Sequence, residues 1–140
     1  ESALHKFIRE VISKSLLSSA HDVSDGGLAL CLAECSISSN LGIKCEIPFG
    51  DVRLDRILFS EGSSRIIVSI SSDKLSLWNS FIMDYKSHFG SLAYATEIGK
   101  VSKDDTFIIT QSSKDIINLK ISRLQDSFEN AIPRRLGVDF

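Results

Sequence analysis

The chain lacks the features of a disulfide-stapled, nucleic-acid-binding or membrane-spanning protein. It has only three cysteines, an odd number without Cys-x-x-Cys spacing, which argues against a disulfide framework and a structural zinc site. Lysine and arginine number 16 against 18 acidic residues, so the net charge of −2 leaves no basic surplus for nucleic acid or an anionic membrane. No apolar run approaches the roughly 18 residues that cross a bilayer, and the first residues lack a signal peptide's basic start. We therefore expect a cytoplasmic protein with no metal site, no nucleic-acid partner and no membrane partner.

A lysine-bearing phosphate loop is also missing, because no Gly-x-x-x-x-Gly-Lys-Ser/Thr sequence occurs. What the chain does have is enough apolar content for a core, with 43% hydrophobic and 24% charged residues in 140. No repeat or low-complexity linker divides it. We therefore expect one globular domain over residues 1–140.

Apolar periodicity predicts alternating helices and strands. Helices are expected from Leu4 to before Ser18, over 25–37, over 73–89, and from a capping box of Ser122 and Gln125 to an end near Pro133. Strands are expected at 19–23, 42–47, 65–70, 94–101, 106–110 and 116–121. Because the order lacks strict βαβ regularity, we predict an α+β fold with a mixed sheet.

Two helical patterns indicate packing and not ligand binding. The aromatic stripe of 73–89, which includes Trp78, Phe81 and Tyr85, is typical of a core-facing helix. Cys31 and Cys35 lie four residues apart, so they share a helix face, where small buried thiols are the simplest interpretation.

The most specific stretch is the nine-residue string that precedes and opens the helix at 25–37. It reads His-Asp-Val-Ser-Asp-Gly-Gly-Leu-Ala, and its candidate ligand-facing residues are His21, Asp22, Ser24, Asp25, Gly26 and Gly27. Cap formers and glycines before a helix are typical of a phosphate-facing turn, because the helix dipole and the first-turn N–H groups favour an anion. The alternative is structural: Ser24 or Asp25 caps the helix, and the glycine pair makes a tight turn.

This string resembles the C-terminal, AIR synthetase-related domain of the phosphoribosylformylglycinamidine synthase family, the amidotransferase-dependent ligases of purine biosynthesis. Two further stretches resemble the same family: Leu-Phe-Ser-Glu-Gly-Ser-Ser-Arg at 58–65, and Phe-Glu-Asn-Ala-Ile-Pro at 128–133. The resemblance spans nearly the whole chain. It implies three α/β/α layers with a mixed sheet and a partly ferredoxin-like topology.

The resemblance also implies a reaction. The family converts formylglycinamide ribonucleotide, ATP and glutamine-derived ammonia into formylglycinamidine ribonucleotide, and the full enzyme uses Mg²⁺ with its ATP. Since the ATP-binding half of each site comes from a preceding domain, this chain is expected to hold no catalytic residue, to bind no cofactor alone and to be inactive alone. The chain's ending resembles the small form of the synthetase subunit. The implied partners are the preceding ATP-binding domains, a separate glutaminase subunit and a small accessory subunit.

The resemblance leaves the role of individual residues open. The family carries two domains of this type, and the closing segment indicates the last copy, in which the turn at 21–27 is either scaffold or ligand-facing. Glu61 and Arg65 match the family's second motif, whereas Gly62, Ser63 and Ser64 depart from it. We expect Glu61 and Arg65 either to contact a ligand or to be structural, as an ion pair or with the Glu61 carboxylate as a backbone cap.

Two other functions fit the same residues. The chain could be a non-catalytic binding or assembly module that kept the fold, or a domain of another enzyme in the AIR synthetase and selenophosphate synthetase superfamily. A fragment of the ligase differs from an independent module in one observable way. It should expose an apolar surface where its partner domain packs.

Overall fold

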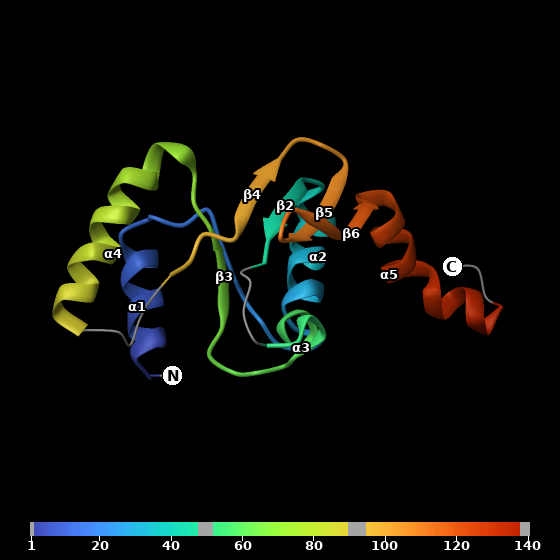
Figure 1. The fold of residues 1–140 in the computed structure, drawn as a ribbon, viewed down its shortest axis with the longest axis horizontal. Helices are drawn as coiled ribbons and strands as arrows, with labels where there is room; N and C mark the ends of the chain where they lie inside the picture. Colours follow the sequence, from blue (N-terminus) through green and yellow to red (C-terminus); the bar gives the residue numbers. More distant parts are fainter. Residues whose placement is uncertain (1, 48–51, 90–94, 138–140) are drawn as a thin grey trace. The chain divides into compact units, whose positions relative to one another are not determined.

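The computed structural model describes residues 2–47, 52–89 and 95–137, and Figure 1 shows the chain as a ribbon. The described residues divide into two compact units. The first unit comprises residues 1–25 and 61–97, and the second comprises 26–60 and 98–140. None of the helices in the described ranges is long and apolar enough to cross a membrane.

The first unit contains two helices and a two-stranded antiparallel sheet. Its elements are α1 Ser2–Ser13, β1 Ser19–Asp22, β3 Ile66–Ser69, the 3-10 turn η1 Ser72–Lys74 and α4 Leu75–Phe89. Strand β1 pairs with β3 so that His21 lies opposite Ile67 and Asp22 opposite Ile66. The two strands therefore bring residues 22 and 66, which are far apart in the chain, to the same end of this sheet.

An aromatic cluster forms the core of the first unit. The Phe7 ring of α1 stands edge-on to two rings of α4, with centroid distances of 6.0 Å to Trp78 and 4.9 Å to Tyr85. These three residues are buried, and Val11 and Leu16 complete the cluster. The interpretation of the stripe at 73–89 as core is confirmed for its buried rings, Trp78 and Tyr85, because packing large rings against one another stabilises the contact of α1 with α4.

The second unit is built on a four-stranded mixed sheet. Its elements are α2 Gly27–Ser39, β2 Gly42–Glu46, α3 Leu54–Phe59, β4 Gly99–Ser102, β5 Thr106–Gln111, β6 Lys114–Lys120 and α5 Ile121–Leu136. The strand order is β4-β2-β5-β6, with β2 parallel to β5 and the other two pairs antiparallel. The predicted α+β fold with a mixed sheet is confirmed.

The alternation of apolar and polar residues explains which face of the sheet is covered. Ile43 and Cys45 of β2 pair with Phe107 and Ile109 of β5, and all four side chains are buried. The intervening Lys44 is exposed. A period of two residues in β2 thus assigns one face to the core and the other to solvent.

Most predicted elements occur with bounds shifted by one or two residues, but four expectations are wrong. Helix α3 was not expected, and residues 95–98, placed in a strand, lie outside any strand, while Tyr94 lies outside the described residues. Ser122 does not cap α5, because the helix already begins at Ile121 with Lys120 at the N-cap. Pro133 does not end α5 either; the helix continues to Leu136 and ends at Gly137, whose φ of 65° is left-handed.

Candidate functional site

The turn after β1 is anchored by one buried side chain and one backbone hydrogen bond. Val23 is only 5% exposed, and its N–H donates to the carbonyl oxygen of Arg65 at 3.0 Å. Its polar neighbours Asp22, Ser24 and Asp25 are exposed. The alternation of one buried and several exposed residues therefore presents the carboxylates and the hydroxyl of the turn to solvent.

His21 lies on β1 and is half-buried. Its Nδ1 atom is 2.7 Å from the carbonyl oxygen of Asp22. Because a carbonyl oxygen can only accept, Nδ1 carries the proton and donates it in this contact. The hydrogen bond fixes the tautomer and the orientation of the imidazole ring.

Residues 61–65 of the second motif belong to the first unit, as do residues 21–25 of the first motif. The Val23 to Arg65 hydrogen bond extends the β1–β3 pairing by one residue, so Arg65 lies next to the end of β1. The Nε–H of Arg65 donates to the carbonyl oxygen of Gly62 at 3.3 Å, which holds the 62–65 turn closed. Ser64 in that turn has a φ of 66°, a left-handed conformation. This contact holds the Arg65 guanidinium against the backbone of its own turn.

The glycine pair belongs to the second unit, so the six residues of the turn are divided between the units after Asp25. Gly26 and Gly27 have φ values of 73° and 69°, which only glycine adopts without strain. A Cβ on Gly27 would stand 2.7 Å from the carbonyl carbon of Phe59 and 2.8 Å from the carbonyl oxygen of Leu58. The end of α3 therefore packs directly against the start of α2. This contact requires glycine at position 27 independently of the φ value.

The predicted cap on α2 is wrong. Gly26 is the N-cap residue, so neither Ser24 nor Asp25 occupies that position. The reason is the pair of left-handed residues, which turn the chain after Asp25 and start the helix at Gly27. The tight-turn part of the structural alternative is supported, whereas its capping part is not.

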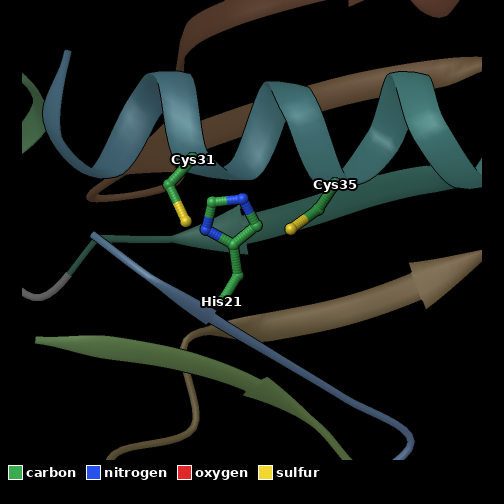
Figure 2. A group of neighbouring side chains, drawn as sticks. All are labelled: His21, Cys31 and Cys35. Carbon is green, nitrogen blue, oxygen red and sulfur yellow. The ribbon is translucent and has the colours of Figure 1, made fainter. Parts of the chain in front are cut away.

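The cysteines pack as small apolar residues. Figure 2 shows the thiols of Cys31 and Cys35 on the same side of α2; His21, which the figure also labels, belongs to β1. Cys31 is 2% exposed, and burial raises the pKa of the Cys35 thiol. Cys45 of β2 is also 2% exposed, and burial raises its pKa to about 11. The thiols of Cys35 and Cys45 therefore stay protonated near neutral pH, which makes them poor nucleophiles.

Comparison with known proteins gives a consistent result along the whole chain. The family model described as "AIR synthase related protein, C-terminal domain" matches residues 1–111. The phosphoribosylformylglycinamidine synthase subunit PurL of Prochlorococcus marinus strain MIT 9313 is 42% identical over 139 residues, which are 99% of this chain and 18% of that protein. The PurL subunit of Synechococcus sp. strain WH7803 is 37% identical over 138 residues, again 99% of this chain and 18% of the relative. The chain thus spans less than a fifth of the length of these relatives.

Solved structures show the same fold. Thermotoga maritima PurL complexed with ATP matches with a TM-score of 0.72 and 19% identity, covering 88% of this chain and 21% of that one. The PurLQS structure from the same organism matches with a TM-score of 0.72 and 20% identity over the same shares. A HypE–HypF complex matches with a TM-score of 0.62 and 20% identity, covering 84% of this chain and 40% of that one. At such identities the likeness shows the fold alone.

Proposed function

The chain belongs to the family of AIR synthase related proteins, as a C-terminal domain of that type, and from this membership we propose that it works within a PurL-type subunit of phosphoribosylformylglycinamidine synthase. The observation that carries the proposal is the 42% identity to a PurL subunit over 99% of the chain. The whole enzyme would join ammonia from glutamine to formylglycinamide ribonucleotide in an ATP-dependent reaction. The 140 residues would act in it as one domain, which the span of the family model across both units supports.

ATP and Mg²⁺ would bind mainly outside this domain. The exposed turn carries the carboxylates of Asp22 and Asp25, and Glu61 precedes the paired strand β3 on an exposed segment. Carboxylates repel phosphates, and the chain has no lysine-bearing phosphate loop. The turn at 21–27, with its two exposed carboxylates, therefore does not favour a phosphate by itself, which supports its scaffold role. Mg²⁺, when bound in the full enzyme, would neutralise and bridge the phosphates of ATP.

The proposed partners follow from the same relatives. The remainder of a PurL-type polypeptide would supply the ATP-binding domains, a glutaminase subunit would release ammonia, and a small accessory subunit would complete the assembly. Solved structures of Thermotoga maritima PurL with ATP and with ADP, and the PurLQS structure, support this proposal. The enzyme would work in the cytoplasm, where de novo purine synthesis supplies nucleotides.

The test is an activity assay of the full-length polypeptide that contains this segment. With ATP, Mg²⁺, formylglycinamide ribonucleotide and an ammonium salt, it should form ADP and formylglycinamidine ribonucleotide, whereas the 140-residue chain should form neither. Ammonium replaces the glutaminase subunit, so the assay needs no partner. Absence of product from a folded full-length polypeptide that binds ATP would contradict the proposal.

A second experiment separates scaffold from ligand contact at the turn. Ser24→Ala and Asp25→Asn in the full-length enzyme should each leave kcat and the KM for formylglycinamide ribonucleotide within about twofold, because a scaffold turn makes no ligand contact and these exposed side chains contribute little to the fold. A ligand contact through either group would raise KM by roughly tenfold, the effect of about 1.4 kcal/mol of lost binding. The amide variant keeps the shape of the carboxylate, so a changed KM would report the lost charge.

A second candidate function has one observation in its favour. The HypE–HypF complex shares the fold, so the domain could serve another branch of the superfamily or act as an assembly module. The 42% identity to a PurL subunit over nearly the whole chain favours the synthase. The same full-length assay decides, because neither alternative predicts formation of formylglycinamidine ribonucleotide.

A further inference from the structure

Helix α5 carries an apolar stripe that begins in the core of the second unit and continues beyond it. The stripe consists of residues three or four positions apart, so their side chains share one face of the helix. Ile121 is 1% exposed and Leu124 is partly buried, whereas Phe128, Ile132 and Leu136 are 57%, 71% and 69% exposed. The buried part of the face therefore passes directly into the exposed part, which we call the α5 stripe: Phe128, Ile132 and Leu136.

The opposite face of the same helix is polar, and its side chains form hydrogen bonds and an ion pair with one another. The amide of Asn130 donates to the Oδ1 atom of Asp126 at 2.9 Å, and the guanidinium of Arg134 pairs with the same carboxylate. This asymmetry over three helical turns marks an amphipathic helix, as in helices that lie on a protein surface. A free helix end of this length is marginal in water, and packing of the apolar face is what usually holds it.

We propose that the α5 stripe docks on the domains that precede this one in the longer PurL-type polypeptide, an inference that rests on the proposed function. Two observations favour this occupant. The relatives are more than five times as long as the matched segment, which is 18% of their length, so most of such a polypeptide lies outside these residues. The stripe is also continuous with a core contact of the same chain, at Ile121.

The size of the stripe argues against an occupant that binds from solution. A large side chain covers about 150 to 250 Å² when buried, so three side chains exposed to this extent cover roughly 300 to 400 Å². A stable complex between separate proteins buries about 600 Å² or more on each partner. A surface in the same polypeptide needs less, because the tether holds it at a millimolar effective concentration.

Maleimide labelling of single introduced cysteines in the full-length polypeptide tests the inference. Ile132→Cys places a thiol on the stripe, and Ser127→Cys is the matched control, since Ser127 is exposed, lies toward the polar face and is nearly the same size as cysteine. Each rate is divided by the rate of the same site in denaturant. We expect the thiol at position 132 to react at least tenfold more slowly than that at position 127.

Equal rates at the two positions would overturn the inference. Protection that disappears on dilution would also overturn it, because it would identify a second copy of the polypeptide as the occupant. If Ile132→Cys does not fold, amide hydrogen exchange of the unmodified polypeptide decides: slow exchange through Leu136 supports docking, and exchange within seconds after Phe128 contradicts it. The ligase assay on the same preparation keeps the two proposals separate, since an active enzyme with an unprotected stripe refutes the docking alone.

Discussion

A Cβ atom added to Gly27 would stand 2.8 Å from the carbonyl oxygen of Leu58, closer than real side chains approach a backbone oxygen. Gly27 also has a φ of 69°, so a side chain at this position is unfavourable for two independent reasons. The backbone of α3 offers no flexible atom that can move aside. The contact limits residue 27 to glycine as long as the end of α3 lies this close to the start of α2.

Gly27→Ala should therefore destabilise the protein strongly. The left-handed backbone costs about 1 to 2 kcal/mol for a residue with a Cβ, and overpacking against α3 adds about 1 to 3 kcal/mol. We expect the free energy of unfolding in urea to fall by roughly 2 to 5 kcal/mol in total.

Two other glycines serve as controls for that measurement. Gly137 has a φ of 65° with nothing near its Cβ position, so Gly137→Ala should show the backbone cost alone. Gly62 also has open space around it and no such φ, so Gly62→Ala should change stability by less than about 0.5 kcal/mol. Equal effects at positions 27 and 137 would refute the close packing of α3 against α2.

In the first unit, Phe7→Ala should remove the centre of the aromatic cluster. Phe7 is 6% exposed and contacts the rings of Trp78 and Tyr85, so its loss leaves a cavity between α1 and α4. We expect a loss of about 3 to 5 kcal/mol. Trp78, the only tryptophan, reports unfolding of this unit by its fluorescence. Met83→Ala on α4 is the control, because Met83 is 72% exposed and its loss should cost less than about 0.5 kcal/mol of stability. A similar loss of stability from Phe7→Ala and Met83→Ala would contradict the assigned core.

The sequence predicted most helices and strands because their apolar residues repeat with a clear period. It missed α3, which has six residues and buries only Leu58, too little for a period to show. It also misjudged the end of α5. The helix continues through Pro133 despite the backbone hydrogen bond that proline cannot make, and the chain turns only where Gly137 permits a left-handed residue.

The candidate turn was only partly predictable for a different reason. Its residue types identified a tight turn before α2, and the structure confirms the turn. The proximity of Arg65 to Val23 depends on the pairing of β1 with β3, which joins segments more than forty residues apart. The requirement for glycine at position 27 depends on α3, an element that the pattern did not reveal. Local patterns carry no information on such long-range contacts.

The cysteines should differ in reactivity toward iodoacetamide in the native protein. Cys35 is half-buried, whereas Cys45 is 2% exposed and its pKa is raised to about 11. At pH 8 about one Cys45 thiol in a thousand is ionised, and the thiolate is the form that reacts. Mass spectrometry should find Cys35 modified before Cys45, with all three cysteines reacting alike in denaturant. Native Cys45 reacting as fast as Cys35 would contradict the burial of β2.

The side chain of Glu46 is hydrogen-bonded to the hairpin between β5 and β6. Its carboxylate accepts hydrogen bonds from the hydroxyl of Thr110 and from the backbone N–H of Ser113, the latter at 3.4 Å. Ser112 and Ser113 both have left-handed φ values, so this turn needs outside support. The Thr110 hydroxyl is the main cause that lowers the pKa of Glu46 below its usual value.

A lowered pKa in the folded state means that the ionised carboxylate stabilises the fold above the ordinary pKa of glutamate, and that this contribution is lost as the pH falls through the folded pKa. Glu46→Gln should therefore be less stable than the parent near pH 7, and the difference should shrink as the pH falls from about 5 to 3. Urea unfolding of both proteins across this pH range measures the difference in stability.

Thr110→Val is the matched variant, because it removes the hydroxyl that donates to Glu46 and keeps the shape of the side chain. It should abolish most of the pH-dependent difference between glutamate and glutamine at position 46, and a difference that persists unchanged would show that the hydroxyl does not hold the carboxylate.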